Sequence, residues 1–345
     1  MMQRKISFQG LWNSFKGIMY NLYYYKTLIN SFIFPQSSAV TAYKLFETPK
    51  YPPKILEWEK QFEESNKFNL LKIPFQDHIN IINERINKNT TNFKFTRIPN
   101  LPKELIVYEF LPNPEVQKRK ETIICVHGWD GRGLNFFKFI PKLQNKGFRI
   151  LVPDFPRHGK TEGIESGCHV FGHSINALIR YINEPVFILA HSVGNGAFCV
   201  NYGLSNENEK NLVKRYVGIC FPNSAYDVLE FFENMIGISN RCHPYFCEEN
   251  SKNLGFNIDE LNIGSILKKY DIPILLIHDK NDKELKFEYA SKAAEHLTHK
   301  HYKVNGTIKP SFFESEGLGH RRIIRDDSIV DRVVEFFSEE IELQD

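Results

Sequence analysis

The segment Phe187-Ile188-Leu189-Ala190-His191-Ser192-Val193-Gly194-Asn195-Gly196 decides how this chain is interpreted. Its apolar first half predicts a buried strand, and a helix is expected directly after the serine. A serine at such a sharp turn needs small neighbours two positions away, and Ala190 and Gly194 stand where the usual pattern G-x-S-x-G has glycines. The turn lifts the hydroxyl out of the sheet, where a base can reach it. Ser192 is therefore a candidate nucleophile.

Short β-branched runs alternate with longer helical stretches on both sides of this segment. Strands are expected at 122–126, 149–153, 186–190, 216–220 and 274–278, and helices at 137–146, 171–182 and 196–204. A last strand is expected within 307–314, followed by a terminal amphipathic helix over 328–342. The alternation predicts an α/β fold with a mostly parallel central sheet flanked by helices.

The alternating pattern has additions at its start and in its middle. Residues 1–90 predict a mainly helical N-terminal extension, which ends at the polar segment 87–90. An antiparallel strand pair is then expected at 93–98 and 105–110. The aromatic interval 222–270 is too long for a simple crossover and predicts a helical cap. The core therefore consists of 91–221 and 271–345.

The composition is that of a soluble globular protein. The 44 basic and 41 acidic residues give a net charge of +3, which is too small to indicate nucleic-acid binding. A secretory signal is not recognised in the sequence, so reduced cysteines and a cytoplasmic location are expected. The spacing of Cys242 and Cys247 does not follow a standard zinc pattern.

Apolar residues recur at helical spacing near the N-terminus. They are Phe8, Leu11, Trp12, Phe15, Ile18, Met19 and Leu22. No apolar run there reaches the roughly 20 residues that a membrane span needs. Two interpretations stay open: an arm packed on the main domain, which we favour, and a basic amphipathic helix that makes peripheral membrane contact through residues 8–34.

A nucleophilic serine needs a base, a group that orients the base, and donors for an oxyanion. His320 is the candidate base, in a glycine-containing loop after the last expected strand, although a loop histidine can also be merely solvated. Asp282 and Asp279 both follow the buried strand 274–278 and are rivals as the orienting acid. Asp279 has the alternative role of tying the turn.

Backbone N–H groups are the expected oxyanion donors. One is that of Val193, directly after the candidate nucleophile. The other is that of Trp129, because Gly128 allows close approach of the loop that follows strand 122–126. Ser192, Asp282 and His320 thus follow one another along the chain, each after a predicted strand.

These motifs together resemble the α/β-hydrolase superfamily. The resemblance extends from Ile106 to the C-terminus and rests on the blocks 125–129, 152–161, 190–194, 278–282 and 319–320. Within the superfamily, the chain looks like the serine esterase and lipase-like branch, because Asp154 to Gly159 matches its Asp-x-x-x-x-Gly turn. The fragment 43–49 resembles an N-terminal extension of bacterial members.

The resemblance implies Ser192 as nucleophile, Asp282 as acid and His320 as base. It favours Asp282 over Asp279, because the acid usually stands last in a His-x-x-x-Asp loop. A serine at position 192 argues against epoxide hydrolases and dehalogenases, which have aspartate there. No metal or organic cofactor is implied, since side chains, backbone amides and water suffice.

The leading hypothesis is hydrolysis of a carboxylic ester or thioester through an acyl-serine. Acyl transfer on the same fold is an alternative, and an acceptor alcohol in the assay distinguishes it from hydrolysis. A catalytically silent ligand-binding protein is another alternative, which tight binding without turnover would reveal. The substrate is expected to be a small molecule, and a lipid ester if the N-terminal helix binds membranes. Candidate substrate contacts are the cap aromatics Tyr226, Phe231 and Phe232, which can also form the core of the cap itself.

Overall fold

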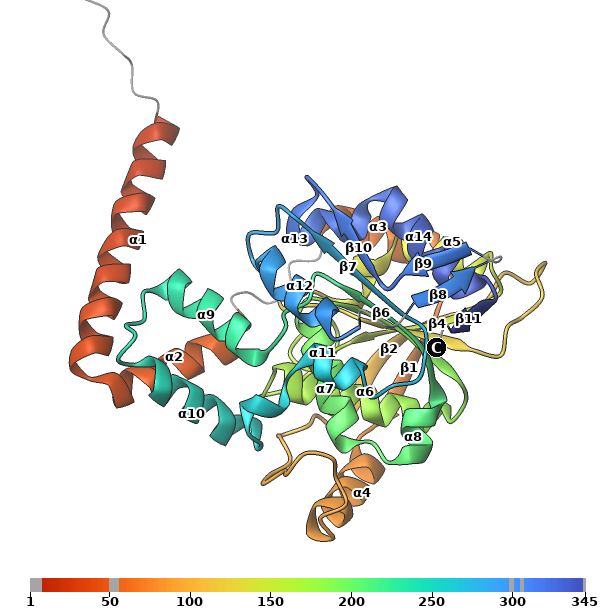
Figure 1. Cartoon of the computed structure of the whole chain (residues 1–345). Helices are drawn as coiled ribbons and strands as arrows, with labels where there is room; N and C mark the ends of the chain where they lie inside the picture. Colours follow the sequence, from red (N-terminus) through yellow and green to blue (C-terminus); the bar gives the residue numbers. More distant parts are fainter. Residues whose placement is uncertain (1–7, 50–55, 298–300, 305–306, 344–345) are drawn as a thin grey trace, which may run out of the picture.

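The computed structural model of the chain describes residues 8–49, 56–297, 301–304 and 307–343. Within these ranges, the side chains of residues 8–18, 20, 342 and 343 lie outside the description. Most of the apolar N-terminal residues named above fall among them. Figure 1 shows a twisted central sheet with helices on both faces and a group of helices projecting to one side.

The central sheet has eight strands in the order β1-β2-β4-β3-β5-β6-β7-β10. Within this sheet only β2 runs opposite to the other strands, since it is antiparallel to both β1 and β4, so the predicted mostly parallel sheet is confirmed. The strands are β1 (Asn69–Pro74), β2 (Glu104–Phe110), β3 (Thr122–Val126), β4 (Arg149–Asp154), β5 (Val186–His191), β6 (Val213–Ile219), β7 (Ile274–Asp279) and β10 (Phe312–Ser315). A small second sheet joins β11 (Ile341–Leu343), β8 (His301–Val304) and β9 (Thr307–Pro310).

The central strands of the sheet are buried on both faces because helices cover both of them. In β3, Ile124 packs in one apolar cluster with α6 and α7, whereas Ile123 packs in the other with α5 and α14. The helices of the core are α3 (Glu57–Ser65), α4 (Gln76–Asn87), η1 (Gly133–Phe136), α5 (Phe139–Gln144), α6 (Cys168–Ile182), α7 (Val193–Leu204), α8 (Glu207–Leu212), α12 (Phe287–Glu295), α13 (Gly319–Arg322), η3 (Ile323–Arg325) and α14 (Asp327–Ser338).

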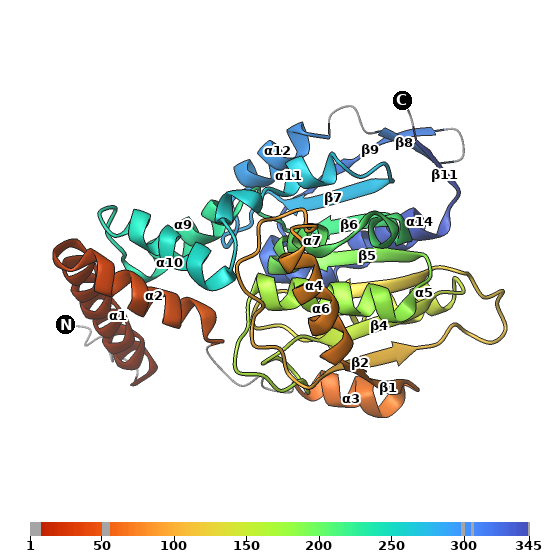
Figure 2. The same ribbon diagram turned by 90° about the horizontal axis from the view of Figure 1, so that it is seen from below.

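The projecting group brings together helices that are far apart in the sequence. It contains α1 (Phe8–Ile33) and α2 (Pro35–Glu47) from the N-terminal segment, with α9 (Ala225–Ile236) and α10 (His243–Leu254) from the interval 222–270. Both views show these four helices side by side (Figures 1 and 2). The interval ends with η2 (Ile258–Glu260) and α11 (Ile263–Leu267). Among the described residues, no helix combines the length and apolar character that crossing a membrane requires.

The first hundred residues contain one strand that was not expected and lack one that was. Residues 69–74 form the edge strand β1 within the segment expected to be mainly helical. Five of its six side chains are at least partly exposed, so its sequence lacks the apolar alternation that reveals inner strands. Residues 93–98 are not a strand. Phe93 and Phe95 are buried, but the segment does not pair with a strand: the backbone N–H groups of Phe93 and Thr96 donate to the carbonyls of Gly203 and Gly255.

The contact between α6 and α7 gives a test of packing. A Cβ atom added at Gly172 of α6 would lie 2.4 Å from Cβ of Val200 and 2.8 Å from the carbonyl oxygen of Ala197, both in α7. The nearest atom to a Cβ at Gly196 is 3.6 Å away. We expect Gly172→Ala to have a free energy of unfolding about 2 kcal/mol or more below that of Gly196→Ala, measured by urea denaturation. Equal stability of the two variants would contradict this packing.

Candidate active site

Ser192 occupies the turn between β5 and α7 with φ of 55° and ψ of −125°. This positive φ is uncommon for a residue with a side chain, and such turns are held by their surroundings. The N–H of Ser192 donates to the carbonyl of Ile219 at the end of β6. A Cβ at Gly194 would lie 2.6 Å from the carbonyl oxygen of Val126, so only glycine fits beside β3. The strand-to-helix turn predicted from the sequence is thus present.

A chain of short hydrogen-bond distances begins at the Ser192 hydroxyl. Its Oγ lies 2.8 Å from Nε2 of His320, and Nδ1 of the same imidazole lies 2.7 Å from Oδ2 of Asp282. Ser192 follows β5, Asp282 follows β7, and His320 lies in α13 after β10. The structure therefore brings together all three residues that the sequence singled out, from three separate strand ends.

The carboxylate of Asp282 is fixed on its second oxygen as well. Oδ1 accepts hydrogen bonds from the N–H groups of Glu284 and Leu285, at 2.8 and 2.9 Å. Burial alone would raise the pKa of Asp282, but its bonds to His320 and to the backbone hold that pKa below its usual value. The group therefore stays ionised and faces the imidazole with one oxygen.

Asp279, the rival acid, makes different contacts. Its Oδ2 accepts from the hydroxyl of Ser315 and the N–H of Leu318, and its Oδ1 accepts from the N–H groups of Gly319 and Asn281, all at 2.8–3.0 Å. Gly319 has a φ of 66°, a conformation that favours glycine. Asp279 thus ties down the loop that carries His320 and leaves the imidazole to Asp282.

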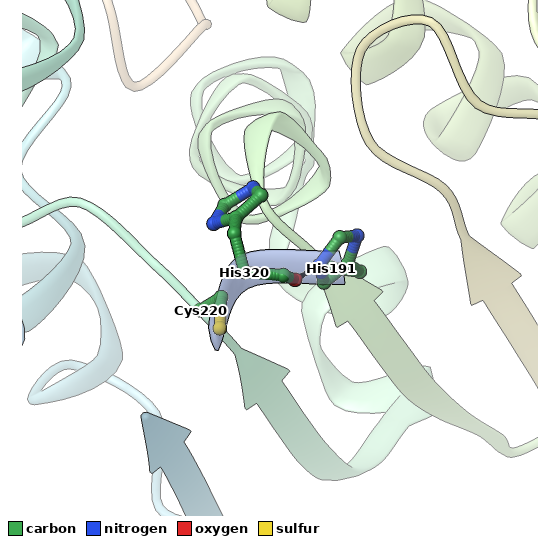
Figure 3. A group of neighbouring side chains, drawn as sticks. All are labelled: His191, Cys220 and His320. Atoms are coloured by element: carbon green, nitrogen blue, oxygen red, sulfur yellow. Dashed lines mark hydrogen bonds between the residues drawn. The ribbon is translucent and has the colours of Figure 1, made fainter. Parts of the chain in front are cut away.

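His191 and Cys220 lie beside the turn that carries His320 (Figure 3), and no role was predicted for them from the sequence. Nε2 of His191 lies 2.9 Å from the carbonyl oxygen of His320. Burial lowers the pKa of His191 to about 3, so the ring is neutral and its N–H donates to that carbonyl. Figure 3 shows the two rings and the Cys220 thiol around the turn that carries His320. The signal for His191 was its place beside Ser192 at the end of a buried strand.

Two groups among the described side chains have potential metal ligands within 4.8 Å of one another. They are His191 with Cys220 and His320, and Cys220 with His278 and Asp282. Several of these ligand atoms already have hydrogen-bond partners: Nε2 of His278 lies 3.0 Å from the carbonyl oxygen of Leu285, and Oδ2 of Asp282 lies 2.7 Å from Nδ1 of His320. Binding a metal in either group would break the contacts that hold His320 in place.

A cavity of about 670 Å³ opens over Ser192 and His320. Phe231 and Phe232 of α9 line it, together with α2 residues such as Phe46. Tyr226 is not among its lining residues, because its hydroxyl turns to Asp259 at 2.6 Å. The cavity is therefore a largely apolar space that the core, the cap and the N-terminal segment enclose together.

The two expected oxyanion donors, the amides of Trp129 and Val193, belong to residues that line the same cavity. Their loops meet closely, because a Cβ at Gly128 would lie 2.9 Å from Cβ of Ser192. Val193 is the first residue of α7, where backbone N–H groups have no partner within the helix. Gly128 and Val193 therefore lie next to Ser192, and the amides of Trp129 and Val193 stay the candidate oxyanion donors.

A family model described as alpha/beta hydrolase fold matches residues 121–237. An esterase of Pyrococcus furiosus, Pf2001, is similar in two crystal forms at 16% identity. The TM-scores are 0.54 and 0.52, with 83% and 84% of this chain and 95% of that chain covered. A bromoperoxidase from Bacillus anthracis matches at 14% identity and a TM-score of 0.47, over 68% of this chain and 96% of that one. No curated protein sequence matches the chain. The family model and the Pyrococcus esterase structure confirm the fold that the sequence resemblance implied.

The Asp279 contacts predict a pH-dependent contribution to stability. Burial would raise the pKa of Asp279, but its hydrogen bonds from Gly319, Leu318 and Ser315 hold that pKa below its usual value. Its stabilisation is therefore complete above the usual carboxyl range and is lost as the pH falls through the lower folded-state value. We expect the free energy of unfolding of Asp279→Asn at pH 7 to be about 1–3 kcal/mol below that of the wild type, because an amide N–H₂ would face backbone donors.

The measurement is urea denaturation of both proteins between neutral and acidic pH. The difference between wild type and variant should shrink as the pH falls from about 5 toward 2. A difference that stays constant over this range would contradict the assignment of Asp279 as the loop's ionised anchor.

Proposed function

We propose that this chain, which has the α/β-hydrolase fold, is a serine hydrolase that cleaves a carboxylic ester or thioester. The observation that carries the proposal is the unbroken series from the Ser192 hydroxyl through the His320 imidazole to the Asp282 carboxylate, at 2.8 and 2.7 Å, beneath an apolar cavity. That the similar Pyrococcus protein is an esterase agrees with it. An EC 3.1.1-type reaction needs no cofactor.

In the acylation step, His320 Nε2 takes the proton of the Ser192 hydroxyl while Oγ attacks the substrate's carbonyl carbon. The carbonyl oxygen becomes an oxyanion, which the amides of Trp129 and Val193 stabilise. Loss of one such donor typically costs about 2.7–4 kcal/mol of barrier height. The protonated imidazole then gives its proton to the leaving alkoxide or thiolate, and an acyl-serine forms.

In the deacylation step, the same imidazole accepts a proton from water, whose oxygen attacks the acyl carbon. Collapse of the second oxyanion breaks the bond to Oγ, and His320 returns the proton to Ser192. The carboxylic acid leaves the cavity. Asp282 keeps the proton on Nδ1 and stabilises the imidazolium that exists between the two transfers.

The cavity wall favours an apolar group on one side of the ester. Phe231, Phe232 and Phe46 present aromatic surface to it, and about 670 Å³ is within the size range of small-molecule sites. Charged groups stand near the imidazole instead: Glu284 Oε2 lies 3.8 Å from His320 Nε2 and pairs with Arg321. The polar reacting carbonyl and the apolar chain thus have separate surroundings.

A fluorophosphonate probe tests the nucleophile. We expect it to label the wild type, and Ser192→Ala to abolish the labelling, since the phosphonyl group is captured by the activated hydroxyl. Ser224→Ala is the matched control, because Ser224 also lines the cavity but makes no contact with His320. It should label as the wild type does. Equal labelling of Ser192→Ala would refute the assignment.

Asp282→Asn tests the orienting acid. The amide can still accept the backbone bonds from Glu284 and Leu285, but it cannot stabilise an imidazolium and favours the wrong tautomer. We expect kcat on a p-nitrophenyl ester to fall by a factor on the order of 10³–10⁴, with the circular dichroism spectrum unchanged. A loss below about tenfold would mean that another group orients His320.

A further inference from the structure

The helix α1 has two faces of different character over its described side chains. The partly or fully buried residues Tyr24, Thr27, Leu28 and Ser31 turn toward the rest of the protein. The opposite face, which we call the outer face, consists of large apolar side chains at helical spacing. They are Leu22 (60% exposed), Tyr25 (60%), Ile29 (57%) and Phe32 (57%).

The outer face continues past the end of α1. Ile33 and Phe34 are 53% and 61% exposed, and Met19 and Tyr23 are half exposed. Single exposed apolar residues are ordinary on a protein surface, but a contiguous stripe of them marks an interaction site. The members of the stripe keep about half or more of their surface exposed, although the guanidinium of Arg241 lies over the ring of Phe32.

The charge of this segment identifies the kind of surface that it fits. Residues 1–46 contain five basic residues, and the first acidic residue of the chain is Glu47. The basic residues are Arg4, Lys5, Lys16, Lys26 and Lys44. The whole chain, by contrast, is nearly balanced between basic and acidic residues. A second copy of the same segment would be repelled, whereas an anionic lipid surface would be attracted.

We propose that the outer face of α1 binds the surface of a bilayer that contains anionic lipids. An apolar stripe flanked by lysine and asparagine lets the helix lie in the plane of the interface, with its apolar side chains among the acyl chains. Tyr23 and Tyr25 suit this boundary, because a tyrosine has an apolar ring and a polar tip. The helix rests on the surface and does not cross it.

Contacts fix α1 to the cap. The N–H of Ser239 donates to the hydroxyl of Ser31 at 2.9 Å, and the guanidinium of Arg241 lies 5.5 Å from the ring centre of Phe32. A Cβ at Gly237 would lie 2.7 Å from the carbonyl oxygen of Tyr24, so the end of α9 touches the helix backbone. The cap therefore moves with α1 when α1 is bound.

The same connection reaches the cavity. The helix α2 starts at Pro35, two residues after α1 ends, and its Phe46 packs against Phe232 of α9 with ring centres 4.9 Å apart. Both rings line the cavity above Ser192. Since α2 has 13 residues and is about 20 Å long, a bound α1 holds the cavity near the bilayer. The consequence, which rests on the proposed function, is that the substrate is a lipid ester whose acyl chain enters this cavity.

Co-sedimentation of the full chain with vesicles tests the docking surface. We expect binding to vesicles of phosphatidylcholine with phosphatidylserine, and weaker binding at high salt or without phosphatidylserine. The triple variant Leu22→Ser/Tyr25→Ser/Ile29→Ser should lower the partition constant by at least about tenfold. The matched control Leu111→Ser/Ile164→Ser/Ile308→Ser removes equally exposed apolar side chains elsewhere and should bind as the wild type does.

A second variant, Lys16→Glu/Lys26→Glu, lowers the net charge of residues 1–46 from +5 to +1 without removing apolar surface and should weaken the preference for phosphatidylserine. Wild type that stays in the supernatant with anionic vesicles would overturn the proposal. So would a dimer in size-exclusion chromatography that the serine triple variant converts to a monomer, because the outer face would then bind a second copy.

Activity measurements separate this proposal from the proposed function. The serine triple variant should hydrolyse a soluble short-chain ester at the wild-type rate, which also verifies that it is folded. Its hydrolysis of a lipid ester presented in anionic vesicles should fall in proportion to its binding. Vesicle binding by a wild type that hydrolyses neither ester would support the docking surface and refute the hydrolase.

Discussion

The turn at Ser192 is the constraint on which the rest of the structure depends. With φ of 55° and ψ of −125°, the chain reverses direction between a buried strand and a helix in one residue. This requires β3 and β5 to be neighbours at the centre of the sheet, with Gly194 against the backbone of Val126 and Gly128 against Ser192. The strain of this backbone is offset by the packing of the strands on both sides. The hydroxyl is consequently presented by a turn that is closely packed against the neighbouring strand.

His320, the hydrogen-bond partner of Ser192, lies on a short helix. Three separate hydrogen-bonding groups hold it in position. Asp279 holds the backbone that leads into it, His191 holds its carbonyl, and Asp282 holds its ring. Two of these groups are anionic, and the buried neutral ring of His191 contributes a dipole without a charge. Position and electrostatics are thus divided among different residues. A change in one of them need not disturb the others.

The parts of this arrangement that can be predicted from sequence are those with a strong local pattern. The apolar run before Ser192, the small residues around it and the strand endings before Asp282 and His320 are such patterns. The edge strand β1 has no such pattern, because an exposed strand is under little pressure to alternate. Phe93 and Phe95 alternate because both are buried against α7 and the cap, and an alternating burial does not require a ladder.

The direction in which side chains point could not be predicted from the sequence either. Tyr226 stands five residues before Phe231 in the same helix, yet its hydroxyl bonds to Asp259 outside the cavity lining. Residue patterns alone left Asp279 and Asp282 as rivals, and the family resemblance favoured Asp282. The donors in the loop 315–319 that bind Asp279 are set by tertiary structure. The only sequence signal for His191 was its place beside Ser192 at the end of a strand, because its bonding partner is a backbone carbonyl 129 residues away.

The shared cavity wall has a consequence for how this protein can diverge. The reacting groups lie in segments that follow strands of the sheet, whereas part of the wall belongs to α2 and α9, which contribute no atom to the series Ser192, His320 and Asp282. Mutations in the wall can therefore alter which molecules fit while the reacting groups stay as they are. Substitutions within the wall are nevertheless constrained by one another. Because Phe46 and Phe232 touch, a change of volume in one of these distant segments selects for a compensating change in the other.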